Sequence, residues 1–119
     1  MRWLRFAILI FFTACSNNDK IPEGIIGKEK MESILWDMIL ADRFSSQFMM
    51  KDSARIDVKK ETFVLYEKVF QVNKVTKDEF IKSYKYYLSR PDITKVIFDT
   101  LASRANRRKE AVYEKTMAE

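Results

Sequence analysis

MESILWDMILAD, residues 31–42, is the stretch that decides the fold. Its apolar residues recur every three or four positions, which is the period of an α-helix with one buried side. We expect this helix to run from about Lys28 to Met50. Trp36, Leu40 and Phe44 lie on its other side, so the helix is apolar almost all round, as in a helix that sits between others or offers a second face to a partner. The first stripe comprises Met31, Leu35, Met38, Asp42, Ser45 and Met49, flanked by Ile34 and Ile39.

The sequence after this stretch predicts three more helices and no strands. It contains only two Gly and two Pro, too few for many tight turns between strands. Asp57 is a candidate N-cap, Thr76 and Glu79 form a capping box, and Pro91 suits a first helical turn. The fold class expected is therefore all-α, a small bundle of about four helices. The further helices are expected at residues 58–72, at residues 77–89, and from about 92 onwards, with the last 15 residues either helical and solvated or frayed.

The first residues of the chain have the pattern of an export signal. A basic start with Arg2 and Arg5 precedes an apolar run that is too short to span a bilayer. The segment Phe12-Thr13-Ala14-Cys15 resembles the bacterial lipobox, with Phe12 where Leu is usual. Cys15 is therefore the predicted lipidation site. The alternative is an ordinary signal peptide whose cysteine lies near the cut by chance. The predicted parts are a signal peptide at 1–14, a lipidated Cys and tether at 15–27, and a helical domain at 28–119.

Composition argues against several classes of function. The net charge is +5, and removal of Arg2 and Arg5 leaves 20 basic and 17 acidic side chains, a net of +3. That excess is too small to indicate nucleic-acid binding. One Cys allows no internal disulfide, and the absence of His removes the commonest metal ligand and general base. We therefore expect no enzyme activity, no cofactor and no metal.

Two features of the first helix are candidate partner contacts. Asp42 interrupts the apolar stripe, and a buried carboxylate is costly unless it is paired or hydrogen-bonded. It is either a functional group or a structural one bonded to a Tyr hydroxyl, an Arg or a helix end. Trp36, Leu40 and Phe44 are either an exposed interaction strip or part of the core of a central helix.

A basic run lies on the last helix and is a candidate contact for anionic lipid. The alternative is a solvated helix face, which is what most such runs are. The run comprises Arg104, Arg107, Arg108 and Lys109.

Three tyrosines on the third helix alternate with lysines, as in proteins that bind single-stranded nucleic acid. The export signal argues against that function. We expect Tyr84 and Tyr87 to pack inward, and Tyr86, with Lys82 and Lys85, to face water.

The chain resembles a family of short lipoproteins from Bacteroidetes-type bacteria that is known only as a domain of unknown function. The resemblance covers roughly residues 21 to 100 and implies an all-helical domain behind a lipobox, with no activity and no catalytic residues to carry over. The segments that carry it are Ile21-Pro22, residues 31–42, Tyr66-Glu67-Lys68-Val69-Phe70, residues 75–80, and Ser83-Tyr84-Lys85-Tyr86-Tyr87 before Pro91.

The function expected is that of a membrane-tethered helical adaptor in the cell envelope. The tether lacks a cluster of acidic residues after Cys15, which favours an outer-membrane lipoprotein facing the periplasm. Its partners are then the membrane, through the lipid, and an envelope protein. One alternative is a chaperone-like holder of exported chains, since six Met residues make an adaptable surface. Another is an unrecognised enzyme that uses Asp42 or the tyrosines.

Overall fold

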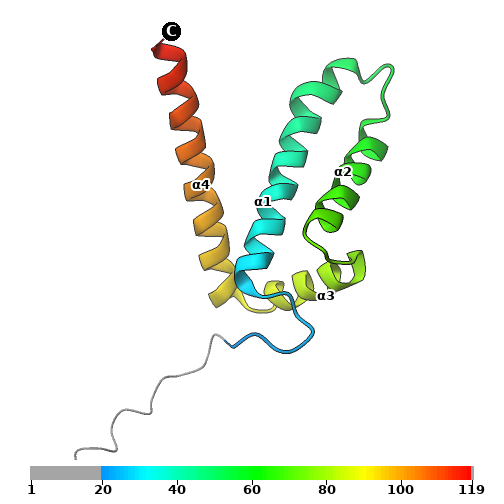
Figure 1. The fold of residues 1–119 in the computed structure, drawn as a ribbon, viewed down its shortest axis with the longest axis vertical. Helices are drawn as coiled ribbons and strands as arrows, with labels where there is room; N and C mark the ends of the chain where they lie inside the picture. The colour runs from blue at the N-terminus through cyan, green and yellow to red at the C-terminus, as the bar shows by residue number, and fades with distance from the viewer. Residues whose placement is uncertain (1–19, 119) are drawn as a thin grey trace, which may run out of the picture.

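The computed structural model describes residues 20–118, and this part of the chain is a small all-α bundle without strands (Figure 1). The predicted fold class is therefore confirmed. The predicted signal peptide and Cys15 lie outside the described residues. None of the described helices is both long and apolar enough to cross a bilayer. The helices are α1 (Lys28–Phe44), followed by a π-helical turn η2 (Ser45–Met49) and a 3-10 turn η3 (Met50–Asp52), then α2 (Val58–Val72), α3 (Lys77–Leu88) and α4 (Pro91–Met117).

The central helix of the bundle is α1 (Figure 1). On one side α2 returns antiparallel to α1, and α3 then crosses the base of the bundle. On the other side α4 starts at the base and diverges from α1 toward its C-terminus. The expectation that the first helix lies between others is thus confirmed, but only its lower half has a neighbour on both sides.

The starts of α2, α3 and α4 follow the chemistry expected from the sequence. The Asp57 carboxylate accepts a hydrogen bond from the Lys60 amide at 3.1 Å. The capping box is complete, because the Glu79 amide donates to the Thr76 hydroxyl at 3.1 Å and the Thr76 amide donates to the Glu79 carboxylate at 2.8 Å. Pro91 occupies the first turn of α4. Each cap satisfies amides that have no partner within the helix.

The end of α2 is a left-handed turn that the sequence did not reveal. Lys74 has φ of +53°, a position that usually takes glycine. The Val75 amide donates to the Phe70 carbonyl at 3.0 Å, and the Lys74 amide donates to the Gln71 carbonyl at 3.1 Å. These two bonds form a Schellman motif, which satisfies the last carbonyls of α2 and turns the chain into α3.

The hydrophobic core lies at the base, where α1, α3 and α4 meet. On α4 the buried residues are Ile93, Ile97 and Leu101, and Ala105 is half-buried. Beyond Ala105 the helix continues to Met117 with no buried residue. The remaining buried members of the core are Met31, Ile34, Trp36, Phe80 and Tyr87.

The segment before α1, which forms the second half of the predicted tether at 15–27, is docked on this core. Ile21, Ile25 and Ile26 pack against the core. The Ile26 amide donates to the Ser83 hydroxyl at 2.9 Å, and the Tyr87 hydroxyl donates to the Ile26 carbonyl at 2.7 Å. The chain bends at Gly24, whose φ of +78° suits glycine. The Ile25 amide donates a hydrogen bond to the Pro22 carbonyl and so completes this turn. Within residues 20–118, the apolar residues of the core and its surrounding layer lie between Ile21 and Ala105.

Replacement of Ile34 with Ala should lower the free energy of unfolding by about 2–5 kcal/mol, because it leaves a cavity in a fully buried site. The measurement is urea denaturation followed by circular dichroism. Ile39→Ala on the same helix is the matched control, because Ile39 is already 36% exposed, and it should cost less than half as much. Equal losses would contradict the placement of the core.

Replacement of Tyr87 with Phe should loosen the segment from Ile21 to Ile26 while the four helices stay folded. It leaves the Ile26 carbonyl without its donor, at a cost of about 1–3 kcal/mol. The measurement is amide hydrogen exchange of this segment, which should become faster. Tyr113→Phe is the control, because Tyr113 is exposed and far along α4. Unchanged exchange in Tyr87→Phe would show that the hydrogen bond does not hold the segment.

Candidate functional site

The second face of α1 changes from buried to exposed along its length. Trp36, Leu40 and Phe44 are four residues apart, so all three point toward α4. Trp36 is 6% exposed, Leu40 is half-buried and Phe44 is 46% exposed. Trp36 is therefore a core residue, which corrects its selection as a partner contact. The gradient exists because α4 lies against α1 at the base and diverges from it above (Figure 1).

The π-helical turn η2 extends this face by one more aromatic residue, Phe48. The rings of Phe44 and Phe48 are 5.2 Å apart between centroids, and Phe48 is 59% exposed. Sequence reasoning missed Phe48, although it continues the four-residue spacing from Phe44. On the other side of the turn, Ser45 is buried and its hydroxyl lies 2.9 Å from that of Thr62 on α2. Thr62 also donates to the Val58 carbonyl, so it can accept the Ser45 proton.

A groove of about 670 Å³ separates the upper part of α1 from the C-terminal half of α4. One wall comes from α1 and η2, and the other comes from α4. The walls carry aromatic and aliphatic side chains together with three cations and no carboxylate. The lining residues are Leu40, Arg43, Phe44, Gln47 and Phe48 on the first wall, and Arg108, Lys109, Val112, Tyr113 and Thr116 on the second.

The four cations of the predicted lipid contact do not share one surface. The Arg104 guanidinium lies over the Trp36 ring, 4.4 Å from its centroid. Arg108 and Lys109 line the groove, with the Lys109 ammonium 5.8 Å from the centroid of the Tyr113 ring. Arg107 lines a separate depression on α4. These side chains point in different directions because successive residues of a helix are rotated by about 100° around its axis.

Asp42 is exposed, which corrects the expectation of a carboxylate within the buried stripe. Met31, on the same stripe, lies about three turns closer to the start of α1. That end of α1 is where α3 crosses the bundle (Figure 1). The Tyr66 hydroxyl on α2 donates a hydrogen bond to the Asp42 carboxylate. Asp42 therefore has one of the structural partners expected for it, a Tyr hydroxyl.

The pKa of Tyr66 is raised to about 12. Burial is the largest cause, followed by the hydrogen bond to Asp42 and the negative charge of Asp42. Each of these disfavours the phenolate. Asp37 contributes a second polar link between α1 and the end of α2, because it accepts from the Asn73 amide group at 3.0 Å. Asp37 and Asp42 thus bond to different residues and do not form a carboxylate pair.

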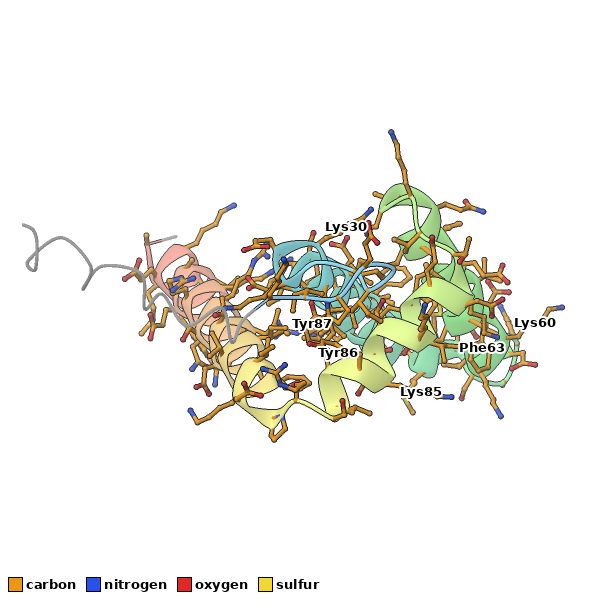
Figure 2. The ribbon with its side chains drawn as sticks, turned by 90° about the horizontal axis from the view of Figure 1, so that it is seen from below. Lys30, Lys60, Phe63, Lys85, Tyr86 and Tyr87 are labelled. Atoms are coloured by element: carbon orange, nitrogen blue, oxygen red, sulfur yellow. The ribbon has the colours of Figure 1, made fainter. Side chains whose placement is uncertain are left out.

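The tyrosines of α3 pack in or against the hydrophobic core. Figure 2 shows Lys85 projecting outward from α3, while Tyr86 and Tyr87 lie toward the centre. Tyr87 is buried, as expected, and Tyr84 is half-buried and packs against the core. Tyr86 was expected to face water. It is instead half-buried, lies edge-on to Tyr87 and accepts from the Arg90 guanidinium at 3.2 Å.

Among residues 20–118, no three acidic side chains lie close enough together to hold an ion.

Replacement of Asp42 with Asn should lower the pKa of Tyr66 from about 12 toward 10 but not to 10, because burial remains. The raised pKa contributes stability that is present below pH 10 and is lost as the pH rises through about 12. The variant should therefore lose less stability across this interval. Phenolate absorbance and urea denaturation at stepped pH measure both effects. Tyr66→Phe identifies the Tyr66 signal, and an unchanged pKa in Asp42→Asn would refute the coupling.

Comparison with known proteins identifies a family for the chain. No curated protein and no solved structure matches it. The family described as a domain of unknown function (DUF4296) matches residues 22–111, from the docked segment through most of α4. This match covers more than half of the sequence, and it agrees with the expected resemblance to an uncharacterised family. The chain therefore belongs to the DUF4296 family.

Proposed function

We propose that this protein is a lipid-tethered adaptor of the cell envelope, anchored in the outer membrane and facing the periplasm, whose helical domain binds another protein. The observation that carries the proposal is the open groove between α1 and α4, with Phe44, Phe48 and Tyr113 exposed on its walls. Contiguous exposed apolar surface on a small domain usually marks a binding site. The three aromatic rings are also of the residue types enriched at protein interfaces.

The docked segment supports a fixed relation between anchor and groove. Ile21 is packed on the base of the bundle, so only residues 16–20 separate it from the predicted lipid on Cys15. The six residue steps from Cys15 to Ile21 reach at most about 22 Å when extended. The 27-residue helix α4 is about 40 Å long and rises from the base. A lipid on Cys15 would then hold the base near the membrane and present the groove away from it.

Replacement of Cys15 with Ser should move the protein from the membrane fraction to the soluble fraction and abolish labelling by a fatty acid. Acyl chains contribute about 0.8 kcal/mol per buried methylene, and the variant has none. The measurement is fractionation with metabolic labelling, followed by mass spectrometry of the mature N-terminus. Ser16→Ala is the neighbouring control and should stay lipidated. A Cys15→Ser protein that remains in the membrane would contradict the lipid anchor.

The partner is tested by crosslinking the tagged native protein and identifying what co-purifies. An adaptor should recover one envelope complex in stoichiometric amount. Recovery of many unrelated exported chains would contradict the adaptor and favour a chaperone-like holder. Recovery of no protein would contradict both.

A further inference from the structure

Within residues 20–118, the C-terminal half of α4 packs on no other helix, and its residues from 106 onward are exposed. Its last half-buried core residue is Ala105, and the next turns expose Val112 and Tyr113 on the side that faces α1. Short helices are marginal in water, and most helical stability in proteins comes from packing an apolar face. The groove therefore has two helical walls that carry apolar side chains, an arrangement that a third helix can fill by side-chain packing.

The charge of the groove restricts what that helix can be. Arg43 projects from the α1 wall, and Arg108 and Lys109 project from the α4 wall, with no carboxylate among the lining residues. Within residues 20–118, neither Arg43 nor Arg108 forms an ion pair. An occupant with acidic side chains beside an apolar stripe would match both the apolar side chains and the cations of the walls.

We infer that the groove binds an acidic amphipathic helix of a partner protein. This inference rests on the proposed adaptor function and names the chemistry of its partner. The apolar stripe of the partner packs on Phe44, Phe48 and Val112, and its flanking Asp or Glu side chains meet Arg43 and Arg108. The lining residues of the α1 wall extend from Leu40 to Phe48, about 12 Å of helix, so two to three turns of the partner are in contact.

Two other occupants fit less well. A second copy of this chain would bring two rims of like charge together, which is unfavourable. Anionic lipid would match the charge, but the groove lies beside the half of α4 farthest from the docked N-terminal segment (Figure 1). A membrane held at the base by Cys15 would not reach it.

The test uses the chain from residue 16, which contains the whole core, and a labelled synthetic helix of about 18 residues. The peptide carries Leu along one face and Glu on both flanks, and a second peptide carries Gln in place of Glu. Fluorescence anisotropy should show one-to-one binding of the Glu peptide that weakens as salt is added. The Gln peptide should bind more weakly.

Matched substitutions separate the groove from the rest of the surface. Arg108→Glu should lower the affinity about fivefold, whereas Arg107→Glu, one residue away and outside the groove, should not change it. Phe48→Ala should lower it about tenfold. Phe63→Ala should have no effect, because Phe63 is similarly exposed but lies with Lys60 on the outer side of α2 (Figure 2). These four residues are exposed, so circular dichroism of each variant should be unchanged.

Four results would overturn the inference. One is equal binding of the Glu and Gln peptides, and another is equal loss in Arg107→Glu and Arg108→Glu. A third is co-sedimentation with phosphatidylglycerol vesicles that Arg108→Glu abolishes while neither peptide binds. The last is a dimer in light scattering that Phe48→Ala dissociates. The crosslinking experiment separates this inference from the proposed adaptor function. If the native protein recovers an envelope complex, and this recovery is lost in Phe63→Ala but not in Phe48→Ala, the partner binds outside the groove. The adaptor function then stands, and only the groove assignment fails.

Discussion

The short apolar stripe of α4 is the constraint on which the rest of this structure depends. Ile93, Ile97 and Leu101 bury against the base of α1 and α3, and each such side chain contributes about 1.5–3 kcal/mol when fully buried. After Ala105 the helix presents no further buried residue to α1, yet it continues to Met117. The two helices therefore touch at one end only. The groove is a direct consequence of this length mismatch between the helix and its apolar stripe.

The two walls of the groove are supported differently. The α1 wall is braced from behind by three polar links to α2 or to its end, which lie at successive levels along α1: Ser45 with Thr62, Asp42 with Tyr66, and Asp37 with Asn73. In the described part of the chain, the α4 wall is held by its buried residues at the base and by the Arg104 guanidinium over Trp36. A binding partner that packed on both walls would bury the apolar side chains of the distal turns of α4 and so stabilise them.

The docked N-terminal segment joins the proposed anchor to the core rather than to a free linker. Ile25 and Ile26 contact the same core as Tyr87, and two hydrogen bonds fix the backbone at Ile26. Any force or orientation transmitted through residues 16–20 would therefore reach α3 and α1 directly. In a protein held at a membrane, this connection would set the direction in which the groove points.

The sequence by itself determined the four helices and the starts of α2, α3 and α4, because capping and periodicity are local. It did not determine the end of α1, where the helix expected to run to Met50 gives way to η2 and η3 after Phe44, or the left-handed end of α2. Asp57, the Thr76–Glu79 box and Pro91 stand where the chain predicts them, and the all-α class follows from the same signals. Only the tertiary structure decided which helix faces were covered. Trp36 is buried and Phe44 exposed on one continuous stripe because α4 diverges, and Asp42 is exposed because α3 closes only the base. Burial depends on the angles between helices, and those angles arise from side chains far apart in the chain, which a local pattern cannot record.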